Sequence, residues 1–159
     1  ATVLRRYVPG PGTDMPIAMV TPAGGSSNTR AYFHVNRQGS TIAMSADNGT
    51  MAEGPYVYDA FGNGAAATGV PFKYTGRRID AETGFYYYRA RYYSPPLGRF
   101  FQTDSVGYGD DMNPYTYVGN DPDGFILLQG AILFRAPGEV FANRSGWVQR
   151  PGEPLCVWK

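Results

Sequence analysis

Three aspartates in the second half of the chain, Asp104, Asp121 and Asp123, are the residues whose type and spacing could support chemistry. Two carboxyl groups brought together can share a proton, so that one acts as a base toward water and the other as an acid. Asp104 follows a strongly aromatic segment and a turn, whereas Asp121 and Asp123 lie on a later predicted loop. Their spacing alone does not bring them together, so an aspartate pair is a hypothesis that depends on the fold.

Other kinds of active site have too few residues of the required types. His34 is the only histidine and Cys156 the only cysteine. One imidazole makes neither a catalytic triad nor a metal site, and one thiol excludes both a disulfide framework and a multi-cysteine zinc site. The glycine-rich segments lack the lysine and the strand-to-helix setting of a phosphate-binding loop. We therefore expect no metal and no cofactor.

The composition indicates the fold class. The 159 residues include 21 glycines, 13 prolines and 13 tyrosines, and only 17% of them are charged. Many turn formers and aromatic residues with few helix formers predict an all-β protein of short strands with little or no helix. A net charge of +1 gives no support to a nucleic-acid surface. The longest apolar run, residues 125–134, has about half the length that a membrane span needs.

The chain is divided by turn signals into short predicted strands. They cover residues 4–8, 17–20, 30–36, 40–45 and 51–58. Arg37-Gln38-Gly39 predicts a hairpin turn, and Asn48-Gly49 predicts a type I′ turn with two positive φ angles. Residues 30–58 are therefore predicted to form a three-stranded meander.

The aromatic segment preceding Asp104 is the element expected to position it. Residues 85–93 lie between turns that contain Gly84 and Gly98, and they predict one long strand with two faces. One face would carry Phe85, Tyr87, Arg89, Arg91 and Tyr93, and the other Tyr86, Tyr88, Ala90 and Tyr92. We expect both faces to pack and hydrogen-bond within a sheet.

Two long segments carry a resemblance to a known family. YFHVNRQGSTIAMSADNGTMAEGPYVYDAFGN has Tyr58-Asp59 and Gly62 in the order of one YD repeat, and YTGRRIDAETGFYYYRARYYSPPLGRFFQTDSVGYGDDMNPYTYVGNDP is similar to a core signature. The sequence thus resembles the RHS (rearrangement hotspot), or YD-repeat, family over about residues 5 to 122. The resemblance divides the chain into lead-in strands (1–29), a YD-repeat-like β-meander (30–64), an RHS core region (65–124) and a variable C-terminal tail (125–159).

The resemblance implies an extracellular or cell-surface protein. Its YD strands would wind into a spiral shell of antiparallel β-sheet, which the core region closes around a variable C-terminal segment, often a toxin. It also implies framework roles for a set of residues in the repeat and the core. These are Tyr58, Asp59, Gly62, Gly84, Tyr86, Tyr87, Tyr88, Arg89, Arg91, Tyr92 and Gly98.

In the same family the core can act as an aspartic autoprotease. Arg99 and Asp104 match the GRFxxxD part of that site. Downstream, Asp121-Pro122 can align with the family's Asn-Asn/Asp-Pro, which puts residues 126–128 near the usual position of the second catalytic aspartate. Alternatively, residues 121–125 (DPDGF) resemble a shortened DPxGL motif with cleavage after Phe125. Ser105 stands where proline is usual. The tail of about 35 residues is too short for an independently folded enzyme.

Three functional hypotheses follow. The first is a structural module that works by assembly and enclosure, because a few strands leave open edges that pair with more sheet, in a longer protein or in copies of this chain. Such edges, and the chain's own tail, are the expected partners. The second is a self-cleaving aspartic peptidase that uses Asp104 with Asp121 or Asp123. The third is a surface adhesin whose tyrosines stack on sugars.

Overall fold

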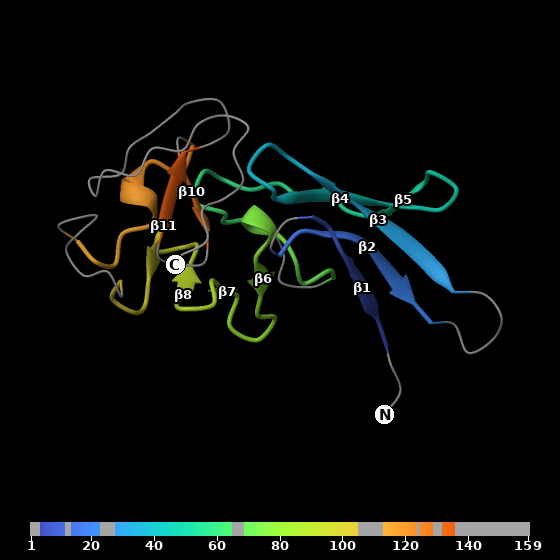
Figure 1. Cartoon of the computed structure of the whole chain (residues 1–159), viewed down its shortest axis with the longest axis horizontal. Coiled ribbons are helices and arrows are strands. Elements are labelled where there is room, and N and C mark those ends of the chain that lie inside the picture. The colour runs from blue at the N-terminus through green and yellow to red at the C-terminus, as the bar shows by residue number, and fades with distance from the viewer. Residues whose placement is uncertain are drawn as a thin grey trace.

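The computed structural model describes residues 4–11, 14–22, 28–64, 69–104 and 113–123, and two further strands at 125–128 and 132–135. In this part of the chain the strands form three antiparallel sheets, and the helical segments are single 3₁₀ turns (Figure 1). The predicted all-β class is confirmed. Cys156 lies outside the described residues.

The first sheet contains five strands in sequence order, on the right of Figure 1. They are β1 (Arg6–Pro9), β2 (Pro16–Thr21), β3 (Thr29–Val35), β4 (Thr41–Ala46) and β5 (Met51–Glu53). Met19 lies opposite Tyr7 on one side and Ala31 on the other, which places these side chains on one face. That face buries a small core of Met19, Ala31, Met44 and Val70.

The turn between β4 and β5 differs from the predicted type I′. Gly49 has a φ of +81°, whereas Asn48 is not among the residues with positive φ. The Gly49 N–H donates to Ala46 O, and the Ala46 N–H donates to Thr50 O. A turn closed by a single left-handed glycine with a bulge is the three-residue solution for a hairpin. The Asn48 side chain accepts hydrogen bonds from the N–H and the hydroxyl of Thr50. These bonds stabilise the turn while Asn48 keeps a negative φ.

The second sheet carries the core region. Its strands are β6 (Arg78–Ile79), β7 (Tyr86–Tyr87), β8 (Tyr92–Ser94) and β9 (Arg99–Phe100), again in sequence order. Two 3₁₀ turns flank this sheet in the sequence, η1 (Tyr74–Gly76) before it and η3 (Val118–Asn120) after it.

The single long strand predicted over residues 85–93 is wrong, because β7 and β8 form a tight hairpin. Tyr86 pairs with Tyr93, and the Tyr88 N–H donates to Arg91 O across the turn. Arg89 takes a φ of +65° there without glycine or proline. The turn shifts the alternation of the faces, so Arg91 is buried and Tyr92 is exposed. Arg89 is exposed, so the predicted shared arginine face is also wrong.

A dense aromatic cluster fills the interior beside the second sheet. It consists of Tyr74, Ile79, Tyr86, Tyr88, Tyr93, Phe100, Tyr117 and Val118. The Tyr93 and Tyr117 rings lie 4.5 Å apart, and Tyr88 meets Phe100 edge-on at 5.5 Å. Such ring pairs add to the burial energy because edge and face carry opposite partial charges.

The third sheet is a two-stranded hairpin of β10 (Phe125–Leu128) and β11 (Ile132–Arg135), drawn in orange in Figure 1. The backbone of Phe125 pairs with that of Arg135. The aliphatic run that follows the core region is therefore folded back on itself as two strands.

Candidate functional site

The turn at Tyr58-Asp59, which we call the YD turn (residues 58–63), is closed by the aspartate side chain. One carboxylate oxygen of Asp59 accepts the N–H groups of Phe61 and Asn63 at 2.8 and 2.9 Å. The Gly62 N–H also donates to Asp59 O. An aspartate is suited to this position because its short side chain reaches the backbone two residues on. Asp59 is thus held in the framework of the turn.

Three tyrosines from the core bind successive carbonyls of the YD turn. Tyr74 donates its hydroxyl to Ala60 O at 2.7 Å, Tyr93 to Phe61 O at 2.8 Å and Tyr86 to Gly62 O at 3.4 Å. Burial raises the pKa of all three phenols above the ordinary value, so they stay neutral donors. We call this set of three residues the tyrosine socket.

Gly62 is required by the socket, because a Cβ at this position would overlap the ring of Tyr74. Its φ of +83° also disfavours other residues. Tyr58 extends the same bonding pattern to the first sheet by donating its hydroxyl to Thr41 O at 2.6 Å. The repeat and the core region are therefore joined by directional bonds as well as by packing.

Asp104, the first predicted catalytic residue, forms an ion pair with Arg91. Their closest atoms are 2.7 Å apart, and the side chains are 15% and 3% exposed. Arg91 also donates to Pro114 O at 3.2 Å and covers the ring of Phe100 at 3.7 Å. Burial lowers the pKa of Arg91, and the charge of Asp104 opposes that shift. Arg99 was the arginine predicted for this site, and no pattern in the sequence indicated Arg91 as the partner of Asp104, because only the hairpin turn directs Arg91 inward.

Asp121 and Asp123 follow η3 and are both exposed. The loop that carries them is held against the turn between β3 and β4, where Gln38 donates to Pro122 O at 2.9 Å and Arg37 to Asp123 O at 3.4 Å. The two halves of the predicted aspartate pair are thus held in different ways. Asp104 is held by Arg91, whereas residues 121–123 are held by the turn between β3 and β4. The backbone of Phe125, the predicted cleavage residue, begins β10 directly after this loop.

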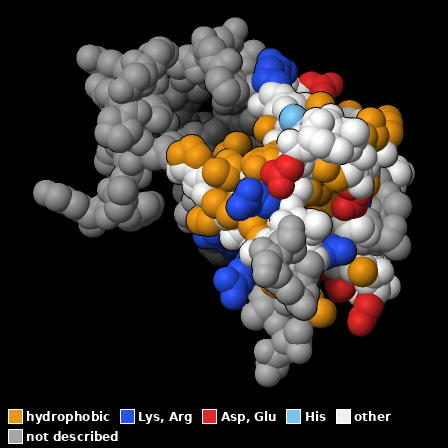
Figure 2. All heavy atoms as spheres, turned by 90° about the vertical axis from the view of Figure 1, so that its right-hand side faces the viewer, with side chains coloured by type: hydrophobic (Ala, Val, Ile, Leu, Met, Phe, Trp, Pro, Cys, Tyr) orange, Lys and Arg blue, Asp and Glu red, His pale blue; other side chains and the backbone are white. Residues whose placement is uncertain are grey.

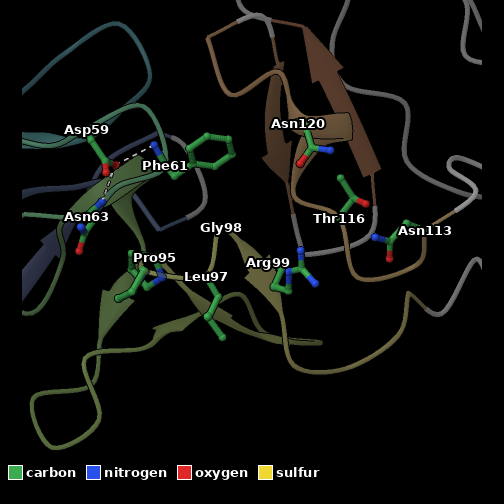
Figure 3. Close-up of a pocket in the computed structure, with 11 residues that line it drawn as sticks. Asp59, Phe61, Asn63, Pro95, Leu97, Gly98, Arg99, Asn113, Thr116 and Asn120 are labelled. Atoms are coloured by element: carbon green, nitrogen blue, oxygen red, sulfur yellow. Dashed lines mark hydrogen bonds between the residues drawn. The ribbon is translucent and has the colours of Figure 1, made fainter.

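Arg99 lines a pocket of about 260 Å³. The pocket is formed by the YD turn, the turn between β8 and β9, and residues 113–120 (Figure 3). Gly98 lies on its wall beside the ring of Phe61. Three segments that are far apart in the sequence therefore line this pocket, and Arg99 is an exposed residue on its lining.

Asp14 makes a second ion-pair site that the sequence did not indicate. It binds both Arg77, which is buried, and Arg89, whose closest nitrogen lies 3.0 Å away. Asp14 lies between β1 and β2, whereas both arginines belong to the core region. No sequence pattern links an aspartate to arginines more than 60 positions later.

The remaining sequence candidates have local roles or lie apart from these sites. His34 bonds to the hydroxyl of Ser45 at 2.9 Å within the first sheet. Tyr87 and Tyr92 are exposed and form a ring pair at 5.4 Å. Among the described residues there is no cluster of three or more potential metal ligands, and no helix there is long and apolar enough to cross a membrane.

Comparison with known proteins places the sequence among much longer chains. No family model matches it. It is 39% identical over 137 residues to the tRNA(Glu)-specific nuclease WapA of Bacillus subtilis subsp. natto, a match that covers 73% of this chain and 6% of that protein. It is 33% identical over 144 residues to the toxin protein Tse5 of Pseudomonas aeruginosa, covering 84% of this chain and 11% of that one.

A solved structure has the same fold. The crystal structure of TcdB2-TccC3 without hypervariable C-terminal region matches with a TM-score of 0.62 and 29% sequence identity. The match covers 71% of this chain and 6% of that chain. The chain thus spans a small fraction of each of these three proteins.

Proposed function

Because this chain belongs to the RHS, or YD-repeat, family, we propose that it is a structural module that builds and closes one end of a β-sheet shell. Residues 1–29 and 30–64 form the wall, residues 65–124 form the closing core, and residues 125–159 are the variable tail. In this proposal the module works by assembly and enclosure, in an extracellular or cell-surface protein.

The tyrosine socket is the observation that carries this proposal. It holds the YD turn through three carbonyl groups, and Asp14 holds the β1–β2 connection to the core through two arginines. Hydrogen bonds made in a buried, low-dielectric setting fix one geometry more strongly than apolar packing does. The attachment of the YD turn and of the β1–β2 connection to the core region supports a role for that region in closing the sheet wall.

The outer strands of the first sheet support the assembly part of the proposal. β1 and β5 each have one neighbouring strand within the described residues. The sheet also leaves large apolar side chains such as Val8, Ile17 and Ile42 exposed. Figure 2 shows hydrophobic side chains gathered on this side of the molecule. An edge and an apolar face of this kind favour addition of further strands.

The relatives support enclosure of a C-terminal segment. Two of them are named as a nuclease and a toxin, and the matched structure is described as lacking a hypervariable C-terminal region. In this chain the segment proposed to be enclosed is the tail, residues 125–159, which follows the loop at residues 121–123. We place the enclosed segment downstream of that loop.

Sedimentation velocity at increasing protein concentration tests the assembly. The chain is expected to form concentration-dependent assemblies, and Val8→Lys on the β1 edge is expected to weaken them at least tenfold, because a lysine on an edge strand opposes strand addition. Leu4→Lys, which lies outside β1, is the matched control. A monodisperse monomer at every concentration would contradict self-association.

Self-cleavage after Phe125 is the second candidate function. It is favoured by the position of Asp104, a largely buried carboxylate beside Arg91, and by the DPDGF motif that leads directly into β10. Intact-mass measurement of freshly expressed protein is expected to show a cut chain. Asp104→Asn should restore the full-length mass, and the exposed Asp47→Asn should not. A persistent full-length mass in the unaltered chain rules the candidate out.

A further inference from the structure

The pocket around Arg99 has features of a ligand site that the proposed shell does not use. Its volume of about 260 Å³ lies near the lower end for small-molecule pockets. In Figure 3 the labelled side chains of Arg99, Thr116 and Asn120 come from β9 and from the segment that follows residue 112. Asp59 and Asn63 of the YD turn lie across the pocket from them.

The lining is rich in groups that both donate and accept hydrogen bonds. Asn63 and Asn120 contribute amides and Thr116 contributes a hydroxyl, whereas the amide oxygen of Asn113 already accepts the Tyr115 N–H. Amides and hydroxyls of this kind match the hydroxyl groups of a sugar, because each sugar hydroxyl is also a donor and an acceptor. Pro95, Leu97 and Phe61 supply an apolar wall that can cover one face of a ring.

Arg99 makes the pocket attractive to a negative charge. Arg77, Arg89 and Arg91 each form an ion pair with an aspartate, but Arg99 has no carboxylate within ion-pair distance in the described part of the chain. The lining also contains Asp59, which lies across the pocket and opposes an anion there, so the attraction is confined to the end of the pocket that holds Arg99. A guanidinium binds a carboxylate through two parallel bonds when the geometry allows.

We propose that this pocket binds one carboxylated sugar, a uronic acid unit of a glycan. The carboxylate would pair with Arg99, the ring hydroxyls with the asparagine amides and Thr116, and one ring face with the apolar wall. An acidic peptide side chain would use Arg99 but leave the amides without hydroxyl partners. The pocket volume suits a single ring.

Isothermal titration of the full chain with galacturonic acid and glucuronic acid tests the proposal. At least one of them is expected to bind saturably with a Kd of roughly 0.1–10 mM, the weak range usual for few contacts. Glucose, which lacks the carboxylate, is expected to bind at least tenfold more weakly. An acetylated, amidated aspartate is the peptide-type probe and should also bind at least tenfold more weakly.

Three variants separate the role of Arg99 from general effects. Arg99→Gln should weaken uronic acid binding at least tenfold, and Arg99→Lys should give an intermediate loss, because lysine keeps the charge but not the paired donors. Arg78→Gln, at another exposed arginine, should change the affinity less than twofold. Circular dichroism confirms that each variant is folded.

Several results would overturn the proposal. They are absence of saturable uronic acid binding, equal binding of glucose, preferential binding of the aspartate probe, and unchanged affinity in a folded Arg99→Gln variant. The titration does not depend on assembly, because Arg99 lies in the second sheet and the edge variant Val8→Lys in the first. Absence of uronic acid binding therefore does not contradict the proposed shell function. Likewise, absence of assembly does not contradict uronic acid binding.

Discussion

The first and second sheets bury their interiors in different ways. The first has a small core of Met19, Ala31, Met44 and Val70, whose side chains carry no hydroxyl group to donate a hydrogen bond. The second buries five tyrosines, and their hydroxyls reach the carbonyls of the YD turn or other hydroxyls. Methionine adapts to irregular gaps, whereas a buried tyrosine must find a partner for its hydroxyl. The tyrosine core can therefore specify one arrangement, and the aliphatic core is more tolerant of change.

Raising the pH is expected to have the largest effect, because the five buried tyrosines of the second core would be driven to ionise together. Folding raises the pKa of Tyr74, Tyr86, Tyr88, Tyr93 and Tyr117, so their stabilisation is complete below the ordinary value of 10.0 and is lost as the pH rises beyond it. Each buried tyrosine should cost about 1.4 kcal/mol per pH unit above that value. Tyrosinate absorbance should appear together with cooperative loss of structure. Separate, gradual ionisation without unfolding would contradict this.

Gly62→Ala tests how closely the YD turn fits the tyrosine socket. A Cβ there would overlap Tyr74 and strain the backbone at a φ of +83°. We expect a loss of roughly 3–5 kcal/mol in the free energy of unfolding. Chemical denaturation measures it.

Gly84→Ala is the matched control, with a φ of +73° and no atom within 4 Å of the added Cβ. It should cost only about 1–2 kcal/mol, the strain of the left-handed backbone alone. Equal losses in the two variants would show that contact with the socket adds nothing.

Asp14→Asn tests the link between the two regions. Removing the charge weakens two ion pairs at once, one of them to the buried Arg77. The expected loss is about 1–3 kcal/mol, smaller in high salt because Arg89 is exposed. Thermal unfolding measures the change. Asp47→Asn, at an exposed aspartate in the turn between β4 and β5, should change stability by about 0.5 kcal/mol or less, because an amide oxygen can still accept the Tyr32 hydroxyl.

Lys73→Met should have the smallest effect, with the opposite sign. The Lys73 side chain is buried, its amine lies 3.6 Å from the centre of the Tyr56 ring, and the amine makes no hydrogen bond among the described residues. Burial lowers the pKa of Lys73, so the buried charge is most costly at low and neutral pH, and the cost fades toward the ordinary value of 10.5.

Methionine should therefore stabilise the chain by about 1 kcal/mol at neutral pH, after the lost cation–π contact is counted. The gain should shrink in thermal unfolding as the pH is raised toward 10.5, the ordinary pKa of lysine. The exposed Arg78→Met should show no such gain. A destabilised Lys73→Met variant would indicate that the amine has an essential partner.

The sequence alone determined the fold class and the family. Short aromatic segments between glycine and proline turns are incompatible with long helices, so composition was sufficient for the all-β prediction. The order of Tyr58, Asp59 and Gly62 indicated the repeat, although its bonds to Tyr74, Tyr86 and Tyr93 were not visible in the sequence.

Only the tertiary structure decided which side chains meet. Alternation along residues 85–93 gives a period of two but does not locate a turn. The turn at Arg89 leaves Tyr92 exposed, apart from the buried tyrosines with which it was predicted to share a face, and it separates Arg89 from Arg91. The pairing of Arg91 with Asp104, and of Asp14 with Arg77 and Arg89, depends on how the sheets are connected. Local patterns specify which residues favour a strand or a turn, whereas contacts between distant residues follow from topology, which a single sequence does not encode in its spacing.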